Sequence, residues 1–260
     1  MKRAWLAGAI AATACCGPKS VKPPTGELTV PQVVDNLAKA RAAMTSFRGD
    51  STMDYWLSGQ RAKGEVLVMG KEGKKIRFAA LSPAGGSTLA EMACDGTNFV
   101  YVDYQNNCSL TGPCDARSIA SFFNIELEPD DFLHLALGTP PVLDNPQGKS
   151  TWDGKGAWKV ELTGAGGSQK LTLNGAMDVL DSELVGADGK TRWSVANTDF
   201  HKVEGSGDRK VPGKTRFKSP AQNQDLLVEW SELVVNEQID DKKFVLSAPA
   251  GLATCGGQKP

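Results

Sequence analysis

The chain has 260 residues, and its 29 lysines and arginines nearly balance 30 aspartates and glutamates, for a formal net charge of −1. Proteins that bind nucleic acid usually carry a clustered basic excess, so this composition argues against a nucleic-acid partner. With 28 glycines and 14 prolines the sequence has the turn residues that a β protein needs. All-β domains often reach this size as a single unit.

The N-terminus has the pattern of an export signal. Met1–Arg3 is basic, and Ala4–Ala14 is an apolar stretch too short to span a bilayer. Small residues stand directly before Cys15, so that residues 12–15 resemble the lipobox of a bacterial lipoprotein. We therefore expect residues 1–14 to be a lipoprotein signal peptide and Cys15 to be lipidated. An ordinary secretory cleavage near Ala14 is the alternative.

Residues 15–29 are expected to form the lipidated N-terminus and a flexible tether, because the stretch is rich in Pro and Gly and lacks periodicity. Thr29–Phe47 then shows helical spacing, with one apolar face. Thr29 can cap this helix and Pro31 suits its first turn. We expect the helix to pack on a sheet rather than lie on a membrane, because its polar face is not rich in Lys or Arg.

Alternating apolar residues predict two strands, over Gly49–Gly59 and Gly64–Gly70. The stretch Lys75–Asp103 predicts three more strands, which are separated by turn residues at 82–86 and by Asp95-Gly96. These strands cover Ile76–Phe78, Thr88–Ala93 and Phe99–Val102. Three adjacent antiparallel strands are enough to bury one face, so we expect this stretch to form the centre of the sheet.

Two short amphipathic helices are predicted over Ala116–Asn124 and Pro129–Leu137, and Asp130 and Asp131 suit the first turn of the second. The second half of the chain returns to short strands between Gly-rich or charged turns. These strands are Trp158–Leu162, Gln169–Leu173, Val179–Leu184, Arg192–Thr198, Lys214–Lys218, Leu226–Val234 and Phe244–Leu246. Serial strands of this kind predict an unclosed antiparallel β-barrel, a curved sheet covered by a few short α-helices.

Four cysteines besides Cys15 and its neighbour Cys16 give an even number in an exported chain, which makes disulfides plausible, with three possible connectivities. Cys108 and Cys114 enclose a Gly-Pro turn, and we expect them to form a local bridge. Cys94 and Cys255 would then pair and hold the C-terminal tail on the central sheet.

The catalytic inventory is small. His134 lies in a predicted helix and His201 in a loop or strand end, and neither has a partner fixed by spacing. The chain has no nucleophile elbow, zinc-protease motif or phosphate loop, and no CxxC pair. Asp130 and Asp131 are explained by their place at a helix start. We expect no catalytic residues, no metal and no cofactor.

A curved sheet under helices would instead offer an apolar cavity suited to an acyl chain. The alternative is a plain hydrophobic core, since apolar stripes are usually core and the inward face of each strand is not fixed by sequence. The candidate cavity residues are Met53, Tyr55, Val66, Val68, Ile76, Phe78, Leu89, Phe99, Tyr101, Phe122, Phe132, Leu135, Trp158, Trp193, Phe217 and Trp230.

Several segments resemble the outer-membrane lipoprotein receptor family LolB. The run Arg77–Met92 is similar to that family's "R-L-x-L-x-S/N-P-L-G-S" segment, and the strand over Phe99–Asp103 to the one that follows it. Further similar segments, in the family's order, are Ile125–Pro140, Trp193–Val195, Val211–Phe217 and Leu226–Trp230. Phe244–Pro249 resembles the ending of the wider LolA/LolB-like superfamily. The resemblance spans about Val30–Leu246.

The resemblance implies that residues 30–260 form a single LolA/LolB-like domain, an unclosed β-barrel with a helical lid around an apolar cavity. It implies binding of lipid or lipoprotein acyl chains, receipt from a periplasmic carrier protein, and a lipid-anchored place on the periplasmic side of the outer membrane. The family's membrane-facing turn matches Pro83, Ala84 and Gly85, but Ala84 replaces a protruding leucine. Arg77 matches a basic residue of the family and is a possible polar anchor; a solvent-facing strand arginine is the alternative.

The function expected from these features is non-enzymatic binding of acyl chains and their transfer or insertion at the outer membrane. A cell-envelope lipoprotein that uses the same fold as a protein-binding sensor or assembly factor is the alternative, which the change at Ala84 favours. A third hypothesis, an exported hydrolase, is supported only by His134, His201 and nearby carboxylates.

Overall fold

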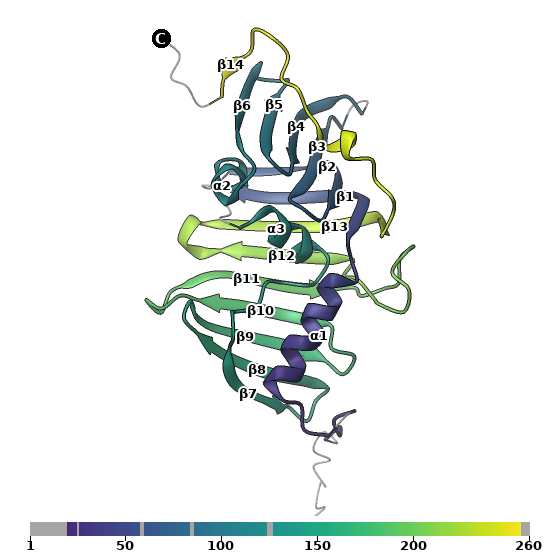
Figure 1. Ribbon diagram of the computed structural model, residues 1–260, viewed down its shortest axis with the longest axis vertical. Coiled ribbons are helices and arrows are strands. Elements are labelled where there is room, and N and C mark those ends of the chain that lie inside the picture. Colours follow the sequence, from purple (N-terminus) through teal and green to yellow (C-terminus); the bar gives the residue numbers. More distant parts are fainter. Residues whose placement is uncertain (1–19, 25, 58–59, 84–85, 124–126, 256–260) are drawn as a thin grey trace, which may run out of the picture.

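The computed structural model describes residues 20–24, 26–57, 60–83, 86–123 and 127–255. Three α-helices and one 14-stranded sheet make up this part of the chain (Figure 1). The helices are α1 (Val30–Ala42), α2 (Ala116–Phe123) and α3 (Pro129–Ala136). Within these ranges no helix has both the length and the apolar character needed to cross a lipid bilayer.

The strands of the first half are β1 (Ser46–Leu57), β2 (Gln60–Lys71), β3 (Lys75–Leu81), β4 (Thr88–Asp95), β5 (Asn98–Asp103) and β6 (Cys108–Pro113). Those of the second half are β7 (Gln147–Trp152), β8 (Ala157–Gly164), β9 (Gly167–Asn174), β10 (Val179–Val185), β11 (Thr191–Thr198), β12 (Lys214–Ser219), β13 (Gln224–Val235) and β14 (Ala253–Thr254). Two short 3₁₀ helices, η1 (Pro220–Gln222) and η2 (Asp241–Phe244), complete the structure.

The sheet runs in the order β14-β6-β5-β4-β3-β2-β1-β13-β12-β11-β10-β9-β8-β7. The chain therefore builds one half outward from β1 to β6, crosses to the opposite edge, and returns from β7 to β13, which pairs with β1. The two edges do not meet, so the expected unclosed antiparallel sheet is confirmed. Figure 1 shows β4–β6 turned steeply against β7–β13, as the accumulated twist of a large sheet produces.

The segment that crosses the sheet passes over its inner face. Gly138 has φ +79° and ends α3 in the left-handed conformation that glycine adopts readily. Residues 137–140 are buried, and Gln169 then holds the segment on β9. Its Nε2 donates to the Pro141 carbonyl at 2.8 Å, and its Oε1 accepts from the Leu143 N–H at 3.1 Å. This path places α3 and the following segment on the same side of the sheet.

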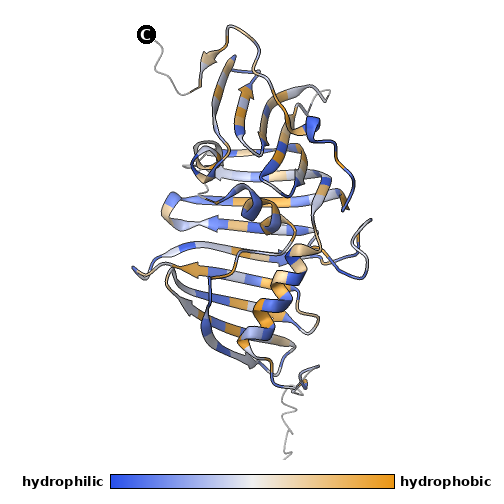
Figure 2. Cartoon of the chain, in the orientation of Figure 1, coloured by the Kyte–Doolittle hydropathy of each residue, from blue (hydrophilic) through white to orange (hydrophobic). Residues whose placement is uncertain are grey.

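Two hydrophobic clusters lie on this inner face. α1 covers β8–β11 in Figure 1, and its Val33 and Leu37 pack with Trp158 and Leu171 in one cluster. The larger cluster joins β1–β5 and β11–β13 to α2 and α3. Gly70 on β2 lets α3 approach closely, because a Cβ there would collide with Leu133. The hydropathy colouring of Figure 2 shows the apolar stripe of α1 and the alternation along the strands.

The C-terminal tail packs on the outer face of the sheet. Asp241 accepts ion pairs from Lys71 and Lys75, both at 2.7 Å, and these lysines lower the pKa of its carboxyl to about 2. Arg77 pairs with Glu91 at 2.7 Å and donates to the Lys243 carbonyl at 2.8 Å. The predicted strand over Phe244–Leu246 is therefore wrong. The chain forms η2 there instead, and Phe244 is buried because η2 contacts β3 and β4.

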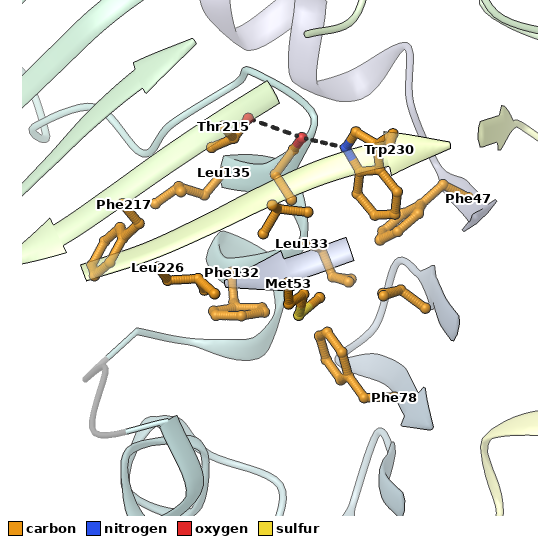
Figure 3. Close-up of a pocket in the computed structure, with 13 residues that line it drawn as sticks. Phe47, Met53, Phe78, Phe132, Leu133, Leu135, Thr215, Phe217, Leu226 and Trp230 are labelled. Atoms are coloured by element: carbon orange, nitrogen blue, oxygen red, sulfur yellow. Dashed lines mark hydrogen bonds between the residues drawn. The ribbon is translucent and has the colours of Figure 1, made fainter. Parts of the chain in front are cut away.

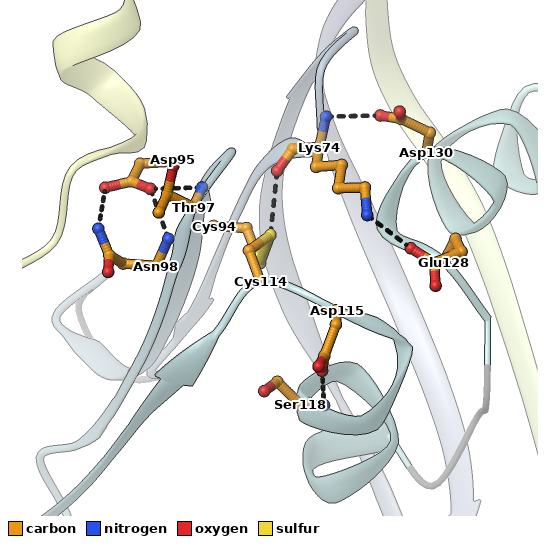
Figure 4. Close-up of a disulfide and its surroundings, with 10 residues drawn as sticks. All are labelled: Lys74, Cys94, Asp95, Thr97, Asn98, Cys114, Asp115, Ser118, Glu128 and Asp130. Carbon is orange, nitrogen blue, oxygen red and sulfur yellow. Dashed lines mark hydrogen bonds and ion pairs between the residues drawn. A yellow bond between two sulfur atoms is a disulfide. The ribbon is translucent and has the colours of Figure 1, made fainter.

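The predicted disulfide pairing is also wrong. The bridges are Cys94–Cys114 and Cys108–Cys255, with sequence separations of 20 and 147. Cys108 and Cys114 cannot bond, because the segment between them is the strand β6 rather than a loop, and an extended chain of that length spans about 20 Å. Figure 4 shows Cys114 beside Lys74, whose carbonyl oxygen lies 3.2 Å from its sulfur.

The remaining expectations for secondary structure agree closely with the observed elements. The three predicted helices are present, but the first is shorter than Thr29–Phe47, because α1 ends at Ala42 and Ser46 already starts β1. The predicted strands from Gly64 to Val102 and from Trp158 to Val234 lie within observed ones, and Gly49–Gly59 matches β1 as far as Leu57. Three strands were missed, β6, β7 and β14, and β14 has only two residues, too few to show any alternation. β6 ends in Gly-Pro and β7 is a polar edge strand, so neither shows the apolar alternation that identifies a strand in sequence.

Candidate functional site

The inner face of β1, β2, β3, β12 and β13 carries a continuous apolar surface beneath α3. Alternation along each strand points Met53, Val68, Phe78, Phe217 and Leu226 inward, and all five are buried. α3 fills the centre of this surface: its Phe132 packs edge-on against Phe78, with ring centroids 5.6 Å apart (Figure 3). Only about 20 Å³ of empty space is left under the helix, so this region is a packed plug.

The C-terminal end of α3 is tied to the sheet. Trp230 Nε1 donates to the Ala136 carbonyl at 3.4 Å, and Thr215 Oγ1 lies 3.5 Å from the same oxygen (Figure 3). The last carbonyls of a helix have no partner within it, so these long contacts satisfy one of them. α3 is thus held by side chains from β12 and β13 at one end and by its apolar face along its length.

A much larger cavity, about 420 Å³, adjoins the plug. It lies on β1–β4 and shares Met53, Phe78 and Leu226 with the packed region. The space exists because several of the residues that point inward here have small side chains. Gly64 pairs with Met53 and Ala62 with Tyr55, while Ala80 and Ala90 pair with each other across β3 and β4.

The mouth of this cavity is at the end of the sheet where the β1–β2 hairpin and the β3–β4 turn lie. Lys63, Glu65 and Pro83 line it there, and Pro83 is exposed. Tyr55, which pairs with Ala62 near the same hairpin end, is half-buried, and this burial raises the pKa of its phenol to about 12. The phenol is therefore neutral, and the wall of the cavity carries no charge at that point.

The structure gathers most of the predicted cavity residues in these two spaces. The small space is lined by Met53, Val68, Phe78, Phe132, Leu135, Phe217 and Trp230. The large one is lined by Met53, Tyr55, Val66, Phe78 and Leu89. Ile76 and Phe99 are core residues of the same cluster, and Tyr101 packs against it. Trp193 lines a further cavity of about 370 Å³ on the other side of α3, together with Phe217 and Ser219.

Other predicted site residues lie elsewhere. Trp158 belongs to the separate cluster beneath α1, where it packs against Trp152 with ring centroids 5.1 Å apart. Arg77 lies on the outer face, engaged with Glu91 and the tail, so it cannot anchor a ligand in the cavity. Cys15, Ala84, Gly85 and the side chain of Phe122 lie outside the described residues.

The two histidines lie in unlike environments. His134 is buried in α3, where its Nδ1 lies 3.2 Å from Thr139 Oγ1, and burial lowers the pKa of its imidazole to about 4. His201 is exposed, with its Nδ1 2.7 Å from the Asp199 carbonyl oxygen. In the described parts of the chain no group of three or more His, Cys, Asp or Glu side chains is arranged to hold a metal ion.

Sequence reasoning missed the small residues that make the large cavity, and it missed Gln224. This glutamine starts β13 and is 4% exposed, and its position in the alternation with Leu226 and Val228 points it to the inner face. Pairing Gly64 and Ala62 against Met53 and Tyr55 across the β1–β2 hairpin would have indicated the missing volume. That signal depends on the register of the hairpin, which the sequence alone leaves open.

No protein-family model and no curated protein matches the sequence. Solved structures do match in fold. A DUF1329 family protein from Desulfovibrio piger is 13% identical, with a TM-score of 0.56, over 84% of this chain and 97% of that one. A LolA superfamily protein from Nitrosomonas europaea is 11% identical, with a TM-score of 0.55, over 84% and 98%.

A third similar structure is a proposed outer membrane lipoprotein-sorting protein domain from Vibrio parahaemolyticus. It is 10% identical, with a TM-score of 0.53, and the match covers 80% of this chain and 94% of that one. Identities this low establish shape and leave the activity open. The resemblance in fold that the sequence motifs implied is confirmed, and this chain has the fold of the LolA superfamily.

Proposed function

We propose that this protein is a membrane-anchored lipoprotein that binds acyl chains in its inner-face cavity and takes part in lipoprotein or lipid transfer at the outer membrane. The observation that carries the proposal is the space of about 420 Å³ among apolar side chains. Ligand sites commonly measure about 300–1,000 Å³. Ten buried methylenes would contribute about 8 kcal/mol at about 0.8 kcal/mol each, several times the ~1 kcal/mol of a neutral hydrogen bond. Chain burial therefore supplies the affinity.

α3 is placed to control access in this scheme. The large cavity and the packed region share Met53, Phe78 and Leu226, so a shift of Phe132 and its helix away from Phe78 would join the two spaces. The site would then take a longer chain and exclude water from it. No bond is made or broken in this cycle; cargo leaves when a site or membrane with higher affinity takes it.

The anchor would act at the far end of the molecule. Residues 1–14 would be removed as a signal peptide and Cys15 would carry the lipid. Val21 is already fixed to the β7–β8 turn, through its N–H to the Gly154 carbonyl at 2.8 Å and its carbonyl to Trp152 Nε1 at 2.6 Å. Six residues from Cys15 span at most about 20 Å, so the β7 edge would stay close to the membrane while the cavity, in the other half of the sheet, faces away.

Blocking the cavity tests the proposal. A Cβ on Gly64 would meet no atom within 4 Å, and Gly64 lines the cavity, so Gly64→Phe projects a ring toward that space. Ala79→Phe is the matched control, because Ala79 lies one residue from the cavity-lining Ala80 and faces the other side of the sheet. The measurement is displacement of a fluorescent fatty acid from the full-length protein, with native mass spectrometry to detect co-purified lipid.

We expect the native protein and Ala79→Phe to bind the probe, and Gly64→Phe to lose at least tenfold in affinity. Equal binding by all three proteins would mean that the chain does not enter this cavity. No binding by the native protein, and a lipid-free mass after gentle purification, would remove the proposal.

A second candidate function is binding of a protein partner, as a sensor or assembly factor. The observation that favours it is an exposed tryptophan on the outer face of β1: Trp56 is 45% exposed, and the Arg61 guanidinium lies 5.6 Å from its ring centroid. Tryptophan and arginine are enriched at binding hot spots. If this candidate is correct, Trp56→Ala abolishes recovery of a stoichiometric protein in a pull-down, while Gly64→Phe leaves it unchanged.

A further inference from the structure

In the described part of the chain, two buried polar side chains of the inner face make no hydrogen bond, and one of them, Gln224, lies next to the cavities. Among buried side-chain nitrogens and oxygens of the described residues, only the Trp158 indole N–H and the Gln224 amide make no hydrogen bond. The Trp158 indole lies in the packed cluster beneath α1. Both Gln224 Nε2 and Gln224 Oε1 are unsatisfied, although the side chain is only 4% exposed. A buried polar group left without a hydrogen bond destabilises a fold, so its presence calls for a reason.

The same chain contains a buried glutamine that is fully bonded. Gln169 is 1% exposed, and its Nε2 donates to the Pro141 carbonyl and to Ser182 Oγ, at 2.8 and 3.0 Å. Its Oε1 accepts from the Leu143 N–H. Gln169 therefore has the hydrogen bonds expected of a buried glutamine that stabilises the fold, and Gln224 has no such bonds.

Gln224 lies between two cavities of the inner face. Two residues further along β13, Leu226 lines the cavity of about 420 Å³, and its cross-strand partner Tyr55 lines it as well. On the other side, Gln224 pairs with Ser219 of β12, which lines the cavity of about 370 Å³ together with Phe217. Neighbouring positions on one face of a strand are about 7 Å apart. Figure 3 shows Phe217 and Leu226 next to each other at this junction.

We infer that Gln224 is the polar junction of a two-armed site, and that its amide binds the uncharged ester or amide linkage from which two acyl chains diverge into the flanking cavities. This inference rests on the proposed acyl-chain function and names its ligand class. Gln224 Nε2 supplies a donor for a linkage carbonyl, and Oε1 supplies an acceptor for a linkage hydroxyl or N–H. Ser219 is not free for this role, because its hydroxyl already bonds the Arg192 carbonyl at 3.0 Å and Gln222 Oε1 at 2.7 Å.

A matched pair of ligands isolates the linkage. 1,2-Dioctanoylglycerol and 1,2-di-O-octylglycerol carry two octyl-length chains and the same hydroxyl, but only the first has ester carbonyls. Burial of the chains is nearly equal for the two, so a difference in affinity reports the hydrogen bond to the carbonyl. We expect the native full-length protein to bind the ester about tenfold more tightly than the ether, from the strength of a buried hydrogen bond.

Gln224→Met is the test variant, because methionine keeps the length of the side chain and removes the amide. We expect it to lose the preference for the ester and to bind the ether as the native protein does. Gln147→Met, at the exposed start of the edge strand β7 and away from both cavities, is the control and keeps the preference. Gln224→Leu serves as a second variant if the methionine protein does not fold.

The outcomes separate this inference from the function beneath it. If the native protein binds neither diacyl ligand nor a single-chain fatty acid, the acyl-chain function itself is wrong. If it binds both glycerides with equal affinity, or if Gln224→Met keeps the preference for the ester, the chain function stands and the role of Gln224 is refuted.

Discussion

The two buried glutamines make opposite contributions to stability, and substituting each by methionine measures them. In Gln169→Met three hydrogen bonds are lost, at 2.8, 3.0 and 3.1 Å. The side chain is 1% exposed, so water cannot fully replace them. A buried group left unpaired costs about 1–3 kcal/mol, and the half-buried segment at Leu143 can reach solvent in part. We therefore expect Gln169→Met to lower the free energy of unfolding by about 3 kcal/mol, the cost of leaving its buried partners without hydrogen bonds.

Gln224→Met removes two atoms that have no partner, so the free energy of unfolding should stay the same or rise by about 1 kcal/mol. Urea unfolding followed by tryptophan fluorescence measures both variants against the native protein, and a constant slope with denaturant shows that the comparison is valid. For a chain of this size about 3 kcal/mol lowers Tm by about 6–12 °C. Equal destabilisation by the two substitutions would refute the reasoning, because Gln224 would then have bonds that matter for the fold.

Three further predictions concern the tail, pH and the anchor. In Cys255→Ser, limited proteolysis should cut the tail after Phe244 before any other part of the chain, because the buried Phe244 and the ion pairs of Asp241 hold only the residues before that point. A first cut elsewhere would contradict this. Burial lowers the pKa of His134 from 6.5 to about 4, so the unfolded chain takes up a proton at a higher pH than the folded chain. The free energy of unfolding should therefore fall by up to about 3 kcal/mol as the pH is lowered from 6.5 to 4. His134→Gln should flatten that fall, and an unchanged pH profile would refute it. Cys15→Ser should move the protein from membranes to the soluble fraction, and continued pelleting would exclude the lipid anchor.

Much of the fold could be predicted because strands and short helices leave local signals. The alternation around Met53 and Phe78 and the glycine that ends α3 at Gly138 are decided within a few residues. The pairing of β13 with β1 and the disulfides are decided across the whole chain. Cys108 and Cys255 are 147 residues apart, and nothing local marks them as neighbours on the β6 edge.

The cavity could be predicted only in part, for a similar reason. Alternation identified large inward strand residues such as Phe78, and the apolar face of a predicted helix identified Leu135. Which of them line empty space depends on where the helices cross the sheet. α1 fills the region around Trp158, which therefore holds no ligand, and α3 fills the region around Phe132. Empty space arises where small residues such as Gly64 and Ala80 take inward positions, and the sequence does not reveal them because alanine and glycine carry no strong inward signal.

A cavity of this size would be costly to the fold if it were both empty and sealed. An empty apolar void costs about 24 cal/mol for each Å³, so a sealed space of about 420 Å³ would cost about 10 kcal/mol on that scale. Whole domains are stable by only about 5–15 kcal/mol. The space must therefore stay open to solvent or hold a ligand. A side chain that fills it should stabilise the ligand-free protein, so Gly64→Phe is expected to raise Tm while it removes binding. If Gly64→Phe lowers Tm and Ala79→Phe does not, the cavity is not free to accept a ring, and a chain of similar cross-section could not enter it either.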